Sequence, residues 1–413
     1  MQEPLEIIFQ FLDEFCSKAG ANCPDGANPA AAVVQGTNGY LYGTTVGGGG
    51  VASDAESTDC DGDAFVDDKN VLHTPGERLS YFFLYFAFCS YPDMGAGPVG
   101  SLVPGPSTPA PAESSSGTRN FYGMANGGGA NLFGTVFEMT PELKVTGLYS
   151  FCSKANCADG AVPNAGLTLG TDGNFYGTTT GGNGNSKCAL LNGCGVVFKI
   201  TPEGVLTTLH SFEGPDGEYP DAGLVQVTSG TFYGTTPNGG ADGFGTIYSL
   251  STGLDPFVAT VPTSAIEGAT INILGQDFTS SSKVKFGDLE ATDVKLNGAT
   301  DLIATLPSGA LTGALTVTTG STTLTSNLPF GVLPDVSSFS PTSGTVGKSV
   351  TINGTGLRQT VEIYFGGVQA TEFKVISDTE VSATVPSGAK TGPVVVEAQG
   401  GTGKSSTNFT VTE

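Results

Sequence analysis

The stretch DGNFYGTTTGG, residues 172–182, occurs in close copies at three other places in the chain. The copies read NGYLYGTTVGG at 38–48, RNFYGMANGG at 119–128 and SGTFYGTTPNGG at 229–240. Self-similarity at a period of roughly 55 to 60 residues is typical of repeat architectures, in which each copy forms one supersecondary unit. The phrase therefore predicts a tandem array of similar units over residues 1–252.

The third copy is the clearest example of the predicted unit. It divides into four short strands, at residues 167–170, 174–179, 196–201 and 205–212. The turns between these strands carry Asp-Gly, Gly-Gly and Pro-Glu-Gly, which supply the positive or pre-set φ of a tight turn. Four antiparallel strands form one blade of a β-propeller. Within the phrase, we expect Gly177 to permit close approach of a neighbouring backbone.

The fourth copy ends at Leu250 without a fourth strand. The N-terminal segment EPLEIIFQFLDEF, residues 3–15, resembles the missing strand, because its Leu12 and Phe15 align with the last strand of the third copy. A first strand that completed the last unit would close a ring and remove exposed strand edges. We therefore expect a four-bladed β-propeller latched by this segment. The alternative is a partial, larger propeller.

Each copy has a tyrosine at the same position of the phrase: Tyr42, Tyr122, Tyr176 and Tyr233. These side chains either pack between units or ring a binding surface. Strand alternation does not say which side of each strand faces water. The sequence favours packing, because aromatic and Thr side chains suit a pleated, half-buried surface.

Composition places the chain among all-β proteins of several domains. The chain has 413 residues with 62 glycines, 13% charged residues and no tryptophan, which favours many short strands joined by turns. Its 39 acidic and 16 basic residues give a net charge of −23. This charge argues against a nucleic acid or an anionic membrane as partner, because both require clustered Lys and Arg. No stretch is long and apolar enough to span a bilayer.

The cysteines predict disulfides and an oxidising compartment. Three pairs lie close together in the sequence, and two cysteines are left for a longer link: Cys16 and Cys23, Cys152 and Cys157, Cys188 and Cys194, then Cys60 and Cys89. Zinc sites favour closer spacings and histidine ligands. We therefore expect disulfides and an extracellular or cell-surface location. The N-terminus lacks the features of a signal peptide, so we expect that a leader has been removed or that the chain is a fragment.

The phrases DGNFYGTT, GTVFEMTP and VVFKITPEG resemble the GloVer-type tandem repeat of bacterial surface and secreted proteins. They resemble the NHL-like propeller repeat more loosely. The resemblance covers residues 1–252 and implies an extracellular propeller whose family has no settled activity. The first copy departs from the pattern, because an acidic insertion near residues 52–78 stands where the GTVF strand is expected.

Two related segments without cysteine follow, at residues 256–332 and 333–413. Each gives about seven short strands in some 80 residues, which is typical of an Ig-like β-sandwich. Both resemble the IPT/TIG domain. The structural proline and glycines of that family are matched in the second segment by Pro341, Gly344, Gly354, Gly356 and Gly366, and the first segment departs with Ala265 and Gln276.

The segment TDCDGDAFVDDKN, residues 58–70, is the sharpest local motif. It places five carboxylates within ten residues: Asp59, Asp61, Asp63, Asp67 and Asp68. Hard cations such as Ca²⁺ prefer such oxygen ligands. The segment resembles thrombospondin type 3 and EF-like acidic loops, although Ala64 and Asn70 depart from their patterns. We consider two interpretations, a structural Ca²⁺ site and a solvated acidic loop.

Candidate catalytic groups are few. His210 falls in a predicted strand and His73 in a Pro/Gly turn, and no carboxylate pair is marked by the sequence. We therefore expect a secreted or cell-surface bacterial interaction or adhesion protein, with a non-catalytic propeller displayed on two Ig-like modules. Its expected ligand is a polysaccharide or a surface protein. The alternative is a carbohydrate-active hydrolase or lyase with its site on a propeller face.

Overall fold

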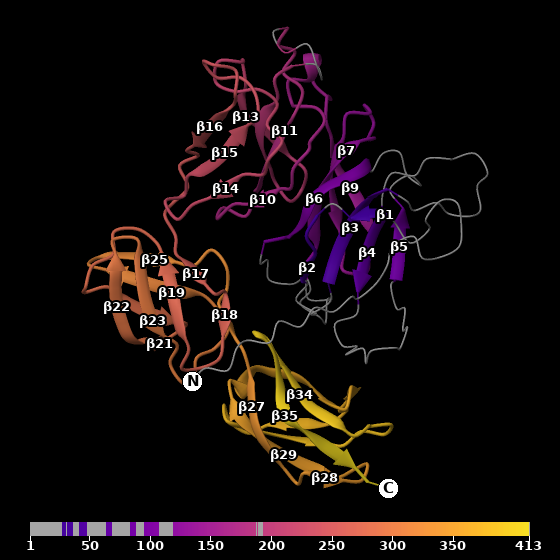
Figure 1. Cartoon of the computed structure of the whole chain (residues 1–413), viewed down its shortest axis with the longest axis vertical. Coiled ribbons are helices and arrows are strands. Elements are labelled where there is room, and N and C mark those ends of the chain that lie inside the picture. Colours follow the sequence, from indigo (N-terminus) through magenta and orange to yellow (C-terminus); the bar gives the residue numbers. More distant parts are fainter. Residues whose placement is uncertain are drawn as a thin grey trace, which may run out of the picture. The chain divides into compact units, whose positions relative to one another are not determined.

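The repeated phrase forms a central strand of an antiparallel sheet in each of the four copies. A computed structural model (Figure 1) describes residues 27–29, 31–35, 41–47, 63–67, 83–87, 95–106, 119–186, 188 and 193–412. The contacts between residues divide the chain into two units. The repeat unit comprises residues 1–225 and 233–249, and the Ig-like unit comprises residues 226–232 and 250–413.

The second and third sheets each contain four strands in chain order. The second consists of β6 (Ala96–Pro104), β7 (Phe121–Gly127), β8 (Thr135–Met139) and β9 (Val145–Ser150). The third consists of β10 (Thr168–Leu169), β11 (Phe175–Thr179), β12 (Val196–Ile200) and β13 (Leu206–Ser211). The four strands predicted for the third copy are therefore confirmed, and each ends within about two residues of its predicted bounds.

The first sheet corrects one expectation about the acidic segment. It contains β1 (Ala27–Pro29), β2 (Val34–Gln35), β3 (Leu41–Gly47), β4 (Asp63–Asp67) and β5 (Phe83–Ala87). Strand β4 pairs antiparallel with β3, and its register opposes Gly43 to Phe65 as Gly123 is opposed to Phe137 in the second sheet. The acidic segment thus supplies the strand that it was expected to replace.

The fourth sheet has three described strands, β14 (Val225–Gln226), β15 (Phe232–Thr236) and β16 (Thr246–Leu250). The predicted latch of residues 3–15 lies outside the described residues. The described sheets do not form a closed ring, because apolar side chains of the fourth sheet, such as Ile247, remain exposed. The structure therefore shows a series of similar antiparallel sheets, two of them with four strands, and closure into a propeller stays a prediction.

The glycine of the repeated phrase accommodates an aromatic ring of its own sheet. Gly177 lies directly opposite Phe198 across the β11–β12 pair, and a Cβ on Gly177 would lie 2.6 Å from the Phe198 ring. Gly123 and Phe137 repeat this arrangement at 2.4 Å. The expected approach of a neighbouring backbone at Gly177 is therefore wrong. The glycine is needed because the ring occupies the space that a Cβ would fill.

The tyrosines of the phrase pack between sheets. Tyr42, Tyr122 and Tyr176 are buried, whereas Tyr233 in the fourth sheet is partly exposed. Their hydroxyl groups reach the sheet margin, where Tyr122 donates to Glu138 Oε1 at 2.9 Å and Tyr42 donates to the carbonyl of Pro141 at 3.3 Å. The packing interpretation thus holds for three of the four tyrosines.

The Ig-like unit contains two sandwich modules with the same pattern of strand pairing. The first consists of β17 (Ala259–Val261), β18 (Ser264–Ala265), β19 (Thr270–Leu274), β20 (Lys283–Phe286), β21 (Leu289–Glu290), β22 (Thr292–Gly298), β23 (Asp301–Thr305), β24 (Leu315–Thr319), β25 (Thr322–Thr325) and β26 (Gly331–Val332). The second consists of β27 (Asp335–Ser340), β28 (Ser343–Gly344), β29 (Ser349–Thr355), β30 (Thr360–Phe365), β31 (Val368–Gln369), β32 (Phe373–Val375), β33 (Glu380–Thr384), β34 (Gly392–Ala398) and β35 (Gly401–Val411), with the 3-10 turn η5 (Leu357–Gln359).

Alternation of exposed and buried residues builds each sandwich core. In β19 the pattern is exposed, buried, exposed, buried, exposed, so that Ile271 and Ile273 point inward. In β29 the same alternation buries Val350 and Ile352. Each module encloses its own hydrophobic cluster, as expected for two inner sheet faces that pack together.

Two carboxyl groups meet at the junction of the modules. Glu267 of the first module accepts hydrogen bonds from Ser308 Oγ at 3.0 Å and Gly309 N–H at 2.7 Å, and its carboxyl group interacts with that of Asp378 in the second module. The buried Asp378 oxygens accept no hydrogen bond from the N–H and O–H groups of described residues. Burial and then Asp378 raise the pKa of Glu267, although the Ser308 and Gly309 donors oppose this shift. When Glu267 is protonated it can donate to Asp378, whereas two ionised carboxylates at this place repel each other.

This carboxyl pair predicts how the stability of the Ig-like unit depends on pH. Because the folded-state pKa of Glu267 is raised, its contribution to stability is present below the unfolded pKa and is lost as the pH rises through the folded pKa. Glu267→Gln keeps a donor without the charge. We expect the variant to unfold at a higher temperature than the wild type at neutral pH, and at about the same temperature in acid. Thermal unfolding followed by circular dichroism measures the difference, and a neutral-pH decrease would contradict the prediction.

Candidate functional site

The predicted calcium ligands lie mostly beyond the described part of the chain. Asp59, Asp61 and Asp68 fall outside it, whereas Asp63 and Asp67 are the first and last residues of β4. Among the described residues, no group of three or more His, Cys, Asp and Glu side chains converges as metal ligands. Calcium binding by this segment therefore stays a prediction.

The predicted position of His210 in a strand is confirmed. It lies in β13, where its Nε2 is 2.7 Å from Asp216 Oδ2 and its ring contacts Phe212 edge to face. Asp216 also accepts a hydrogen bond from the N–H of Glu213 at 2.8 Å. Burial would raise the pKa of Asp216, but the Glu213 and His210 donors outweigh it and lower this pKa. His73 lies outside the described residues.

Two of the predicted disulfides are present, one in the loop that precedes the third copy and one within that copy. Cys152 is bonded to Cys157 and Cys188 is bonded to Cys194, whereas the cysteines at positions 16, 23, 60 and 89 lie outside the described residues. The first bridge encloses the 3-10 turn η3 (Ala155–Cys157). The two bridges pin two neighbouring loops at one end of the third sheet.

The side chain of Asp159, two residues after Cys157, holds the first of these loops by hydrogen bonds. Its buried carboxylate accepts hydrogen bonds from the Tyr149 hydroxyl at 2.7 Å, from the Ser153 hydroxyl and N–H at 2.8 and 2.9 Å, and from the Lys154 N–H at 3.1 Å. Burial alone would raise the pKa of Asp159, but these donors outweigh it and lower this pKa. Burial and the bond to Asp159 raise the pKa of Tyr149 to about 12. The loop is therefore held by an ionised, fully bonded aspartate.

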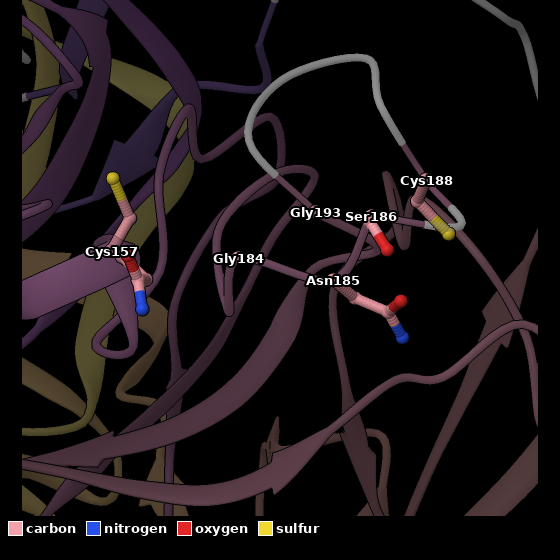
Figure 2. A pocket seen from close by; sticks show the side chains of 7 residues that line it. Cys157, Gly184, Asn185, Ser186, Cys188 and Gly193 are labelled. Carbon is pink, nitrogen blue, oxygen red and sulfur yellow. The ribbon is translucent and has the colours of Figure 1, made fainter.

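A pocket of about 290 Å³ opens between the two loops. Its lining is Asn156, Cys157, Gly184, Asn185, Ser186, Cys188 and Gly193. Figure 2 shows Cys157 on one side and Asn185, Ser186 and Cys188 on the other. Asn156 and Ser186 are exposed and Asn185 is half-buried, so that amide and hydroxyl groups face solvent beside two disulfides.

Asn183 and Gly184 give the pocket its shape. The Asn183 side chain donates to the carbonyls of Phe212 at 2.7 Å and Gly195 at 3.3 Å, and its Oδ1 accepts the Asn185 N–H at 3.0 Å. A Cβ on Gly184 would lie 2.6 Å from Cβ of Asn156. The two loops can therefore approach each other only where this residue has no side chain.

The lining defines what the pocket can do chemically. Among the described residues, its polar side chains are two asparagines and one serine, and these residues include neither a carboxylate nor a histidine. Such groups donate and accept hydrogen bonds without charge, whereas acid–base hydrolysis of a glycosidic bond needs two carboxyl groups. Sequence reasoning missed these residues, because asparagine, serine and glycine between two cysteines look like an ordinary loop. The third Cys pair, Cys188 and Cys194, is the signal that could have pointed to the pocket.

The fold and the pocket define an all-β protein in which repeated antiparallel sheets precede Ig-like modules. Residues 104–256 match the Gloeobacter/Verrucomicrobia repeat, and residues 334–412 match the IPT/TIG domain. No curated protein matches the chain. Among the described residues, no helix is long and apolar enough for a membrane crossing.

Three solved structures of surface glycan-binding proteins are similar to parts of the chain. SGBP-B from a xyloglucan utilization locus of Bacteroides uniformis has 23% identity over 37% of this chain and 48% of its own, with a TM-score of 0.19. PbSGBP-B of Prevotella bryantii has 21% identity over 39% and 40%, with a TM-score of 0.27. The mixed-linkage glucan SGBP-B of Bacteroides ovatus has 17% identity over 45% and 54%, with a TM-score of 0.18. The matches therefore cover about half or less of each of these proteins.

Proposed function

We propose that the chain is a non-catalytic interaction protein of the bacterial cell surface that binds a neutral polysaccharide. The observation that carries this proposal is the pocket between the Cys152–Cys157 and Cys188–Cys194 loops, whose lining, among the described residues, is polar and uncharged. The Ig-like modules then serve to display the repeat unit.

The chemistry of the pocket favours a polyhydroxylated ligand. The amides of Asn156 and Asn185 and the hydroxyl of Ser186 can each exchange hydrogen bonds with sugar hydroxyl groups. A polyanion would meet a chain of net charge −23, so a neutral glycan suits the surface better than an acidic one. A volume of about 290 Å³ is at the lower end for a small-ligand pocket and suits one or two sugar rings of a longer chain.

The two disulfides support an extracytoplasmic location, because such bonds persist in oxidising compartments. Pinned loops also favour binding, since a rigid site loses less conformational entropy when it orders a ligand. Binding by such a site requires no catalytic side chain. The carboxylate nearest in sequence to the first loop, Asp159, is buried and already bonded to Tyr149, Ser153 and Lys154.

Titration calorimetry of the full chain with xyloglucan, mixed-linkage β-glucan and polygalacturonate tests the proposal. We expect binding of at least one neutral glucan and none of the polyanion. Asn185→Ala should weaken this binding about tenfold, a loss of about 1.4 kcal/mol, because one side chain supplies a donor and an acceptor. Asn164→Ala is the matched control, since Asn164 is exposed and is not part of the lining.

Three outcomes would contradict the proposal. Binding that Asn185→Ala leaves unchanged would place the ligand elsewhere, and preference for polygalacturonate would overturn the neutral-glycan assignment. Release of reducing ends from a bound glucan would favour the alternative, a carbohydrate-active hydrolase or lyase. The reducing-end assay is run on the same samples, so binding and turnover are separated in one experiment.

A further inference from the structure

Successive sheets of the repeat unit join through the same pair of surfaces each time. The Tyr42 ring of the first sheet lies 4.4 Å from that of Phe121 in the second, and the Tyr122 ring lies 4.2 Å from that of Phe175 in the third. The tilt of the rings is also similar, at 35° and 32°. At both junctions, one sheet therefore contributes the tyrosine of its phrase, and the next sheet contributes the phenylalanine that precedes its own tyrosine.

Each later junction also carries one backbone hydrogen bond. Val162 N–H donates to the carbonyl of Phe133, and Tyr219 N–H donates to the carbonyl of Cys194, both at 2.8 Å. Both donors have left-handed φ, 53° at Val162 and 58° at Tyr219. Branched and aromatic residues disfavour this conformation, so the junction itself holds them there.

The last sheet exposes the surface that the others bury, which we call the trailing face: Tyr233, Phe244 and Ile247. Tyr233 is 43% exposed, whereas the equivalent Tyr122 and Tyr176 are 5% and 0% exposed. Ile247 is 81% exposed, whereas Val136 and Val197 at its position are fully buried.

Phe244 completes this face. It is 91% exposed, but its equivalent Phe133 packs against the cluster that joins the second and third sheets. Such contiguous apolar exposure marks an interaction surface rather than a solvated one. The trailing face thus has the composition of an internal junction, but no described sheet packs against it.

The first sheet exposes the complementary surface, which we call the leading edge: Asn28 and Val33. Val33 is 50% exposed, whereas Leu102, Leu167 and Leu224 at the same position are 4% to 5% exposed. Asn28 has a φ of 56°, the value that Val162 and Tyr219 adopt at the later junctions. The leading edge is therefore already in the conformation that a preceding sheet would bind.

We propose that the trailing face of one chain docks on the leading edge of a second copy, head to tail. Both surfaces are exposed in the same molecule, so the first sheet of the chain does not cover its own last sheet. Three internal junctions already pair equivalent surfaces, through ring contacts at the first two and backbone hydrogen bonds at the last two. A contact between two different surfaces is heterologous, so it adds copies until a ring closes. This association is independent of the proposed polysaccharide site.

Sedimentation velocity of the full chain and of two charge variants tests the proposal. We expect the wild type to form species of two or more copies as its concentration rises. Ile247→Asp and Val33→Asp each remove one surface, so each variant alone should associate at least tenfold more weakly. An equimolar mixture should recover dimers but nothing larger, because one trailing face and one leading edge remain intact. Val346→Asp, at a residue of the second Ig-like module that is 52% exposed, is the control for added charge and should behave as the wild type.

Each other result would overturn the proposal. A monomeric wild type at the highest soluble concentration, with both substitutions lowering its melting temperature, would indicate closure within one chain. A dimer that Val33→Asp leaves unchanged would indicate a contact between two identical faces. Failure of the mixture to recover dimers, with both variants folded by circular dichroism, would exclude the head-to-tail arrangement.

Discussion

Phe198→Ala is expected to lower the free energy of unfolding of the repeat unit by about 3–5 kcal/mol. The ring is fully buried, lies 5.2 Å from the ring of Phe151 in an edge contact, and belongs to the cluster that joins the second and third sheets. Its removal leaves a cavity that two packed sheets cannot fill by small movements. Urea unfolding followed by tyrosine absorbance measures the loss. Tyr364 is the one tyrosine beyond residue 252, so the other 11 of the 12 report on the repeat region.

The glycine opposite this ring provides a second, coupled substitution. Gly177→Ala would place a Cβ 2.6 Å from the Phe198 ring, and overpacking of this kind costs about 1–3 kcal/mol. In the double variant Gly177→Ala, Phe198→Leu, the smaller aliphatic side chain makes room for the methyl group. We therefore expect the double variant to lose less free energy of unfolding than the sum of the losses in Gly177→Ala and Phe198→Leu measured singly. Additive losses would show that Gly177 is needed for some reason other than the ring.

Local turn chemistry accounts for what could be predicted from the sequence. The strands of the third copy are bracketed by Asp172-Gly173 and by Pro202-Glu203-Gly204, so their bounds follow from residues a few positions away. Strand β4 was missed because aspartates at Asp63 and Asp67 hide a short apolar run, and only pairing with the distant β3 makes it a strand. Such long-range pairing overrides the weak local preference of aspartate for loops.

The junctions and the pocket depend on contacts that no local pattern reveals. A left-handed Val162 contradicts its intrinsic preference and is imposed by a hydrogen bond to Phe133, almost thirty residues earlier in the chain. The pocket forms because Asn156 and Asn185 come from two loops that meet only in the folded sheet. The sequence predicts that these loops are pinned by disulfides, but it carries no signal for their relative position.

Asp159→Asn is expected to lower the free energy of unfolding of the repeat unit by roughly 2–3 kcal/mol at neutral pH, because it removes the charge that three donor residues share. The buried carboxylate binds the hydroxyl groups of Tyr149 and Ser153 and the N–H groups of Ser153 and Lys154. An amide in this place turns an N–H₂ group toward donors, so at least one of them loses its partner. Asp221→Asn is the matched control, since Asp221 is exposed on the same unit.

The dependence on pH separates the charge of Asp159 from its shape. Because its folded-state pKa is lowered below the ordinary value of 3.8, the stabilisation is present above the unfolded pKa and is lost as the pH falls through the folded pKa. The difference between the wild type and Asp159→Asn should therefore be greatest near neutrality and should shrink in acid. Urea unfolding at a series of pH values measures it. A difference in free energy of unfolding that stays constant into acid would mean that the carboxylate stabilises the loop through its shape alone. Equal stability of the two proteins at neutral pH would show that the four hydrogen bonds contribute nothing to folding.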